Sequence, residues 1–136
     1  MSQVTRIPDD WRLEMICRRF QNIVFDNAVF NVADQIAEHY DGGLWEYYQR
    51  DGQFFYMVPD TDTGIDISVP GNYFQGRVSS DAFGLICTLT ALGQVLMHLH
   101  SKGQYELGHR LNDYFHELRI YAIEHPEAEQ IMRAID

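Results

Sequence analysis

Apolar residues recur at a spacing of three to four near the start of the chain, which is typical of helices that bury one side. The spacing predicts one helix over residues 11–20 and a second over residues 26–39, the latter ended by Gly42 and Gly43. The side chains that the first helix is expected to bury are Leu13, Ile16, Cys17 and Phe20. The chain is therefore expected to begin with two amphipathic helices.

The centre of the chain is rich in β-branched and aromatic residues, and parts of it alternate between apolar and polar positions, which predicts strands. Asp51-Gly52 is a strong signal for a two-residue hairpin turn, and this turn would pair Tyr47 with Tyr56 and Trp45 with Val58. The four predicted strands cover residues 44–49, 54–58, 65–69 and 73–78. We expect them to form a four-stranded antiparallel meander.

A stretch without any charge, Ala82 to Ser101, follows the strands. It is long enough to span a bilayer, but Thr88, His98 and other polar residues interrupt it. This pattern favours a central helix that is buried on most sides. Ser79 or Ser80 is well placed to cap that helix at its start.

Two further helices are predicted after Gly103, over residues 104–124 and 126–134. The order of helices, then strands, then helices predicts an α+β fold. We expect about five helices packed with the four-stranded sheet, in a single domain over residues 1–136.

Charge is distributed unevenly along this chain. The net charge is −10, and nine acids against the single base Arg50 lie between Asp26 and Asp66. Such a segment repels nucleic acid and favours a basic partner, so direct nucleic-acid binding is not expected. The aromatic run from Trp45 to Tyr56 is interpreted as sheet core, because base-stacking platforms combine their rings with basic grooves.

Cysteine usage bears on the compartment. Cys17 and Cys87 are far apart and fit no metal-ligand spacing, and small secreted scaffolds use more cysteine than this. Polar residues such as Arg6 and Asp9 interrupt the N-terminal segment, where an export signal needs an apolar core. We expect a cytoplasmic protein with two free thiols and no membrane segment.

The sequence contains no motif for nucleophilic catalysis or for phosphate binding, and Ser79-Ser80-Asp81 is interpreted as a helix cap. His109, Asp113 and His116 share one helix face and could begin the metal site of a hydrolase. The same spacing is also typical of a solvated helix face. We predict no enzyme activity, no cofactor and no metal.

The polar ridge of the second predicted helix carries Asp34, Glu38 and Asp41. This ridge is either a surface that faces a partner or an ordinary solvated helix face, and the sequence leaves both interpretations open. We name these three acids as candidate partner-binding residues.

Three segments together resemble a known family. They read YDGGLWEY (residues 40–47) with GQFFYMVP (52–59), SDAFGLICTLTAL (80–92) and HPEAEQIMRAID (125–136). The chain resembles the ArdB/KlcA antirestriction proteins of plasmids and other mobile elements, from about Leu13 onward and in the same order. Family members often have Phe-Gly soon after the first helix, where this chain has Phe20-Gln21.

The resemblance implies a small non-enzymatic α+β protein that helps incoming DNA escape type I restriction enzymes. The expected partner is the restriction–modification enzyme or its DNA complex. The resemblance supplies no contact residues, but Asp136 is added as a candidate. A carboxylate after the last helix has no evident folding role, and the helix dipole disfavours it there. We expect Asp136 to contact a partner or an arginine elsewhere in the fold.

An acidic DNA mimic, whose acidic ridge occupies a DNA-binding groove of the restriction enzyme, is the alternative. B-DNA carries one charge per about 1.7 Å of its axis, so a mimic needs dense acids along its whole length. In this chain the acids are concentrated between residues 26 and 66. The sequence therefore favours antirestriction by protein contacts without catalysis and ranks mimicry second.

Overall fold

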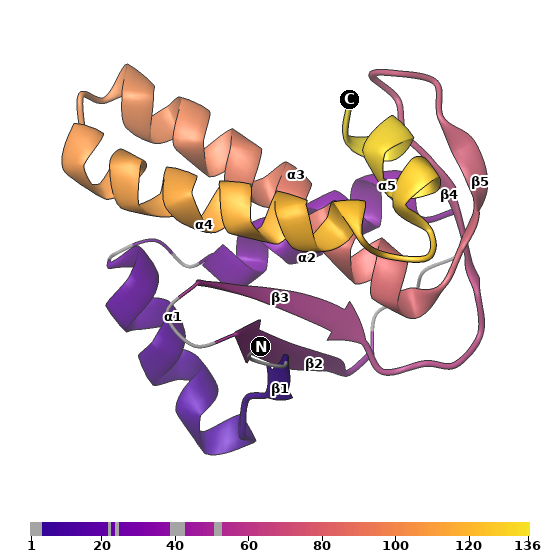
Figure 1. The fold of residues 1–136 in the computed structure, drawn as a ribbon, viewed down its shortest axis with the longest axis horizontal. Helices are drawn as coiled ribbons and strands as arrows, with labels where there is room; N and C mark the ends of the chain where they lie inside the picture. The colour runs from indigo at the N-terminus through magenta and orange to yellow at the C-terminus, as the bar shows by residue number, and fades with distance from the viewer. Residues whose placement is uncertain (1–3, 22, 24, 39–42, 51–52) are drawn as a thin grey trace.

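The structure is a computed structural model that describes residues 4–21, 23, 25–38, 43–50 and 53–136. Its helices are α1 (Arg12–Phe20), α2 (Phe25–Ile36), α3 (Ser80–Ser101), α4 (Tyr105–Ile123) and α5 (Ala128–Ile135), with a 3-10 turn over Asp9–Trp11. Its strands are β1 (Thr5–Arg6), β2 (Trp45–Arg50), β3 (Phe54–Pro59), β4 (Ile65–Ser68) and β5 (Gln75–Val78). These elements confirm the predicted α+β class (Figure 1).

Strands β1, β2 and β3 form an antiparallel sheet in that order, and helices pack on both of its faces (Figure 1). On one face the ring of Phe55 meets the stacked rings of Phe20 and Phe25 from α1 and α2. On the other face the ring of Tyr121 from α4 lies 5.2 Å from the ring of Phe54, between centroids. Every residue of β3 is buried, so the aromatic hairpin is part of the core.

Helix α3 closes the outer edge of β3. Gly84 brings the helix so near the strand that a Cβ atom at this position would lie 2.0 Å from the carbonyl oxygen of Met57. One turn further along, the hydroxyl of the buried Thr88 accepts a hydrogen bond of 3.2 Å from the backbone N–H of Met57. An uncovered edge strand would expose unpaired backbone groups. The helix therefore both satisfies and shields the backbone of β3.

Among the described residues, α3 is also the one helix that is long and apolar enough to cross a membrane. However, 67% of its most apolar window is buried inside the fold, where α2, α4, α5 and β3 contact it. The helix begins as predicted, because the hydroxyl of Ser79 accepts a hydrogen bond of 3.1 Å from the backbone N–H of Ala82. The uncharged stretch is thus the central helix of the core.

The predicted register of the β2–β3 hairpin is wrong by one residue. Tyr56 pairs with Tyr48, whereas the predicted two-residue turn paired it with Tyr47. The last pair is Arg50 with Phe54, so three residues separate the strands, which is another common hairpin length. The turn dipeptide itself lies outside the described residues. Because side chains alternate along a strand, this shift moves Tyr56 to the face that α4 covers.

The predicted four-stranded meander is corrected to two separate sheets. Among the described strands β4 pairs only with β5, and on its other side Ile67 forms a bridge to Ala37 just after α2. The backbone N–H of Glu38 also donates to the carbonyl of Asp66 at 3.0 Å. The chain that follows α2 thus occupies the side of β4 where β3 was expected, and α3 covers the edge of β3. The third strand of the first sheet is the two-residue β1, which was not predicted.

Helix α1 buries Ile16 and Phe20 as predicted, but the rest of its packed side differs from the prediction. Leu13 and Cys17, which were expected to face inward, are exposed, and Met15 is buried instead. Arg12 completes the packed side, because its guanidinium carbon lies 4.6 Å from the centre of the Tyr47 ring. Long arginine stems cover apolar surface, and the spacing of apolar residues alone does not reveal this contribution.

Candidate functional site

Two of the acids proposed from the sequence are accessible in the structure. Asp34 is exposed on α2, and Glu38 is exposed just beyond the end of that helix. The backbone contact of Glu38 with Asp66 fixes the position of this segment. Asp41, together with Gly42 that was predicted to end the helix, lies outside the described residues. The carboxylates of Asp34 and Glu38 are therefore available to a partner.

Asp136 follows α5 and is exposed, but its backbone has a role in the fold. The side-chain amide of Asn72, in the loop between β4 and β5, donates to the carbonyls of Arg133, Ala134 and Asp136 at 3.1, 2.9 and 3.1 Å. The last carbonyls of a helix otherwise lack partners inside the helix. Asp136 was expected to contact either a partner or an arginine of the fold. Within the described part of the chain, its side chain forms no ion pair with an arginine.

A polar cluster forms where the start of α3 meets the segment that leads into α5. We call it the α3–α5 junction, and it consists of Tyr56, Ser79, Asp81, His125 and Glu127. The Glu127 carboxylate accepts two hydrogen bonds from Ser79, one of 2.9 Å from the backbone N–H and one from the hydroxyl. Since the same hydroxyl caps α3, Glu127 ties the segment before α5 to the first turn of the central helix.

Asp81 forms the second half of the junction. Its Oδ1 accepts a hydrogen bond of 3.0 Å from the hydroxyl of Tyr56, and its Oδ2 lies 2.9 Å from Nε2 of His125. The Nδ1 atom of His125 accepts a hydrogen bond of 2.9 Å from the backbone N–H of Glu127, so this nitrogen carries no proton. With Nδ1 as an acceptor, Nε2 is the ring nitrogen that donates to Asp81.

The junction geometry favours a clamp between elements over catalysis. Nucleophilic catalysis needs a hydroxyl or thiol next to a base that a third group orients. In the junction the Ser79 hydroxyl donates to Glu127 and accepts from the N–H of Ala82, while His125 is directed at Asp81. The serine and the imidazole therefore serve separate contacts, each of which joins two elements of the fold.

Burial of Tyr56 gives the junction a testable pH dependence. Burial is the main reason that the pKa of Tyr56 is raised well above its ordinary value, followed by the hydrogen bond with Tyr121 and the charge of Asp81. In the unfolded chain a tyrosine ionises near pH 10, so the stability from the neutral Tyr56 is complete below pH 10 and is lost as the pH rises above it. We expect this residue to lower the free energy of unfolding by about 1 kcal/mol between pH 10 and 11.

Urea unfolding of wild type and Tyr56→Phe at pH 9, 10 and 11 measures this effect. The variant is expected to be less stable at pH 9, because the hydrogen bond to Asp81 is lost, but to lose less stability on going to pH 11. Tyr105→Phe is the control, since Tyr105 is 56% exposed. Equal alkaline losses in wild type and Tyr56→Phe would contradict the assigned role of burial.

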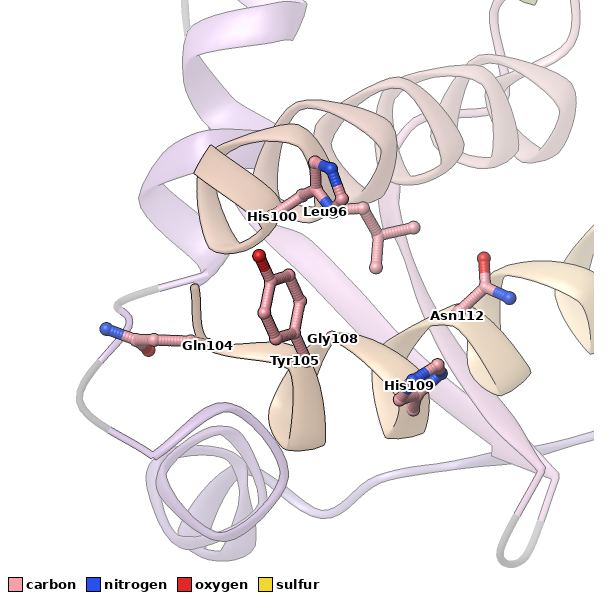
Figure 2. Close-up of a pocket in the computed structure, with 7 residues that line it drawn as sticks. All are labelled: Leu96, His100, Gln104, Tyr105, Gly108, His109 and Asn112. Atoms are coloured by element: carbon pink, nitrogen blue, oxygen red, sulfur yellow. The ribbon is translucent and has the colours of Figure 1, made fainter. Parts of the chain in front are cut away.

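The three residues considered for a metal site are not brought together. Among the described residues, no group of three or more His, Cys, Asp or Glu side chains is placed to hold a metal ion. His109 lines a pocket of about 250 Å³ between α3 and α4, where Figure 2 shows the rings of His100 and Tyr105 next to each other. Asp113 and His116 line a different pocket on α4. A shared helix face therefore did not produce a shared site.

Four of the five junction residues come from the segments on which the family resemblance rests. Tyr56 belongs to GQFFYMVP, Asp81 to SDAFGLICTLTAL, and His125 and Glu127 to HPEAEQIMRAID. Taken one at a time, these segments predict a strand, a helix cap and a helix start. The available signal was that each of the three segments contains side chains able to share hydrogen bonds, and only the fold shows that these side chains meet.

Comparisons with known proteins find similarity to antirestriction proteins. Residues 38–136 match the family model described as antirestriction protein. The antirestriction protein KlcA of Escherichia coli is 40% identical over 102 residues, which cover 75% of this chain and 70% of that protein. The putative antirestriction protein YubI of Escherichia coli (strain K12) is 30% identical over 110 residues, which cover 79% of this chain and 76% of that protein.

A solved structure of the KlcA and ArdB proteins resembles this chain over its full length. The TM-score is 0.84 and the sequence identity 34%, with 100% of this chain and 98% of that chain covered. Those proteins are described as having a novel fold and antirestriction activity against type I DNA restriction systems in vivo but not in vitro. The similarity thus includes the N-terminal residues that precede the match to the family model.

Proposed function

The chain belongs to the antirestriction protein family, and on this premise we propose that it protects incoming mobile-element DNA from type I restriction–modification systems. The family model covers residues 38–136, and the similarity to the KlcA and ArdB structure extends over the whole chain. The activity described for those relatives is directed against type I DNA restriction systems. We assign the same class of target to this chain.

Protein contact without catalysis is the mechanism that we infer for this protection. The observation that carries this inference is the engagement of the junction side chains with one another. Asp81 accepts hydrogen bonds from Tyr56 on β3 and His125 before α5, and Glu127 accepts from Ser79 at the start of α3. These bonds hold the three elements together. Both carboxylates belong to the family segments. Their use in the fold leaves the exposed surface as the functional part of the protein.

The behaviour of the relatives supports a protein partner that is present in the cell. KlcA and ArdB are described as active in vivo but not in vitro. A DNA mimic competes directly for a DNA-binding groove, so it is expected to act in a purified reaction as well. For this chain we therefore favour contact with an assembly that forms in the cell, namely the restriction enzyme on its DNA or a factor that controls the enzyme.

Asp34, Glu38, Asp41 and Asp136 remain proposed contact residues in this account. Exposed charges at the rim of an interface mainly steer association and contribute little affinity. A chain with a net charge of −10 would approach a basic partner in this way. We assign these acids an auxiliary role in recognition.

Neutralising the ridge separates protein contact from mimicry. We expect the triple variant Asp34→Asn, Glu38→Gln and Asp41→Asn to keep protection of unmodified phage DNA within about threefold of wild type, because rim charges contribute little. A mimic would lose its competing charges and most of its activity. The measurement is the plating efficiency of unmodified phage on cells with a type I system.

The matched control changes the same number of charges elsewhere. Glu106→Gln, Asp113→Asn and Glu124→Gln alter exposed acids of α4 and of the residue after it. Both triple variants are expected to plate phage alike. If only the ridge variant loses protection, and partner binding depends steeply on salt, the mechanism is DNA mimicry and not the protein contact that we propose.

A further inference from the structure

The loop between β4 and β5 presents Tyr73 in an unusual way. Tyr73 has a backbone φ of 61°, in the left-handed region that side chains with a Cβ atom adopt at a cost. Its side chain is 88% exposed, more than any other large hydrophobic residue that the structure describes. Strained backbone that displays a large ring to solvent contributes nothing evident to the core. Such outliers justify a hypothesis of function.

Contacts within the loop hold this conformation. The backbone N–H of Tyr73 donates to the carbonyl of Val69 at 3.0 Å, and the N–H of Val69 donates to the carbonyl of Phe74 at 2.8 Å. Asn72 accepts a hydrogen bond of 3.0 Å from the N–H of Phe74. The residue after Tyr73 is thus fixed on the core side, because Phe74 is buried. The tyrosine ring has to point away from the fold.

The same loop is anchored to the last helix. The Asn72 amide that accepts from Phe74 also donates to the three carbonyls at the end of α5. The guanidinium carbon of Arg133, on α5, lies 5.4 Å from the centre of the Phe74 ring. Figure 1 shows this loop beside the end of α5. Tyr73 is therefore displayed on a rigid support, so a partner that binds it would not have to order the loop.

The surroundings of Tyr73 differ in charge from the rest of the molecule. We call the exposed residues that the loop and the end of α5 contribute the Tyr73 patch; they are Pro70, Gly71, Tyr73, Gln75, Arg133 and Asp136. One base and one acid balance each other here, whereas the whole chain carries a net charge of −10. Cores of protein interfaces are depleted in charge and enriched in tyrosine and arginine.

We propose that the Tyr73 patch is the central contact through which the chain binds its protein partner, with the Tyr73 ring inserted into an apolar pocket of that partner. Tyrosines that fill a pocket dominate the binding energy of many interfaces. A nucleic-acid site would combine the ring with a basic groove, and here Arg133 is the one base of the patch. This proposal rests on the proposed function and names the surface that carries it.

The partner is a protein other than a second copy of this chain. A two-fold symmetric contact brings the same surface of both copies together. The two pockets described above are lined by residues of α3 and α4 together with Gln53 and Gln104, and neither contains a residue of the Tyr73 patch. In a symmetric dimer formed through two Tyr73 patches, each tyrosine ring would therefore meet the other ring and would not enter a pocket.

The strain at Tyr73 allows a variant that removes the ring without weakening the fold. Asparagine tolerates the left-handed conformation better than other side chains with a Cβ atom. For Tyr73→Asn we expect a Tm that is unchanged or raised by up to about 4 °C. Protection of unmodified phage on a host with a type I system should fall about tenfold or more. Tyr73→Phe, which keeps the ring, should retain most of the protection.

Met97→Ala is the matched control, because Met97 is 75% exposed on α3 and alanine suits a helix. It should protect like wild type. If wild type itself gives no protection, the proposed function fails. If wild type and Tyr73→Asn protect equally, only the Tyr73 patch is wrong. Loss of protection with a Tm drop above about 5 °C would make Tyr73 a structural residue and overturn the proposal.

Two measurements on purified protein test the nature of the partner. Gel filtration with light scattering compares the mass of wild type and Tyr73→Asn. Fluorescence anisotropy with a labelled single-stranded oligonucleotide compares their affinity for nucleic acid. We expect no difference in either measurement. A dimer that the variant abolishes, or tight oligonucleotide binding that it abolishes, would overturn the assignment of a heterologous protein partner.

Discussion

Gly84→Ala is expected to destabilise the protein by about 3 kcal/mol, the largest effect that we predict for a single methyl group. The added Cβ would lie 2.0 Å from the carbonyl oxygen of Met57 and 2.9 Å from the Cα of Val58. Both are backbone atoms, so the clash cannot be relieved by rotating a side chain. The central helix has to move away from β3, and the hydrogen bond of Thr88 to Met57 weakens with it.

Gly93→Ala on the same helix is the control, because a Cβ atom there would meet no heavy atom within 4 Å. Alanine is the better helix former by about 1 kcal/mol, so this change is expected to be neutral or stabilising. Urea unfolding followed by circular dichroism compares both variants with wild type. A stability of Gly84→Ala within about 1 kcal/mol of wild type would contradict the close packing of α3 on β3.

Glu127→Ala is expected to cost about 2–3 kcal/mol of folding free energy. The change removes the carboxylate that accepts from both the backbone N–H and the hydroxyl of Ser79, and these groups are partly buried. A buried donor that loses a charged acceptor costs more than an exposed one. The α3–α5 junction then keeps the contacts of Asp81 and the hydrogen bond from the backbone N–H of residue 127 to His125. We expect α5 to be the first element to open.

The neighbouring Glu129→Ala removes an exposed carboxylate from the first turn of the same helix. Its expected cost is below about 1 kcal/mol. A double-mutant cycle with Ser79→Ala measures the junction contact directly, and we expect a coupling energy of at least about 1 kcal/mol. Similar losses in Glu127→Ala and Glu129→Ala, with no coupling to Ser79, would show that the junction does not join the two segments.

The sequence was sufficient to predict most elements of this fold because their signals are local. The uncharged stretch and its serine cap predicted α3, and the structure begins that helix at Ser80 after the Ser79 cap. The pattern after Gly103 predicted helices over residues 104–124 and 126–134, and α4 and α5 lie in these stretches, with α5 starting two residues later than predicted. Periodicity, capping residues and helix breakers all act within a few residues along the chain.

The errors concern how elements pair, which local signals do not determine. The hairpin register depended on a loop longer by one residue than the predicted turn, and that residue changed the face of every side chain on one strand. The two-residue β1 is too short to show alternation. The contact of Ala37 with Ile67, which separates the two sheets, joins segments that are far apart in sequence.

Backbone conformations at two positions were also beyond the sequence. Gln21, where the resembling family often has glycine, has a φ of 56° after α1. Tyr73 has a φ of 61° within the β4–β5 loop. A glycine at either position would have indicated a left-handed residue, but glutamine and tyrosine give no such signal. At Tyr73 the hydrogen bonds of Asn72 to α5 and to Phe74 hold the conformation.

Some residues of the candidate site could be named from the sequence, and others are evident only in the fold. Asp34 and Glu38 were placed on a polar ridge by helical spacing, and both are exposed. The Tyr73 patch could not be found by spacing, because its exposure follows from the burial of Phe74 and from the anchoring of the loop on α5. Asp136 was named from the sequence and is also part of the Tyr73 patch, because it lies at the end of the helix that anchors the loop.

The plating efficiency of unmodified phage tests the central claim most directly. Phage grown without modification are titred on an isogenic pair of hosts, with and without a type I system, each with and without expression of this chain. We predict that expression raises the titre on the restricting host by at least about tenfold and leaves the other host unchanged. An unchanged titre on the restricting host, with folded protein present in the cells, would contradict the account.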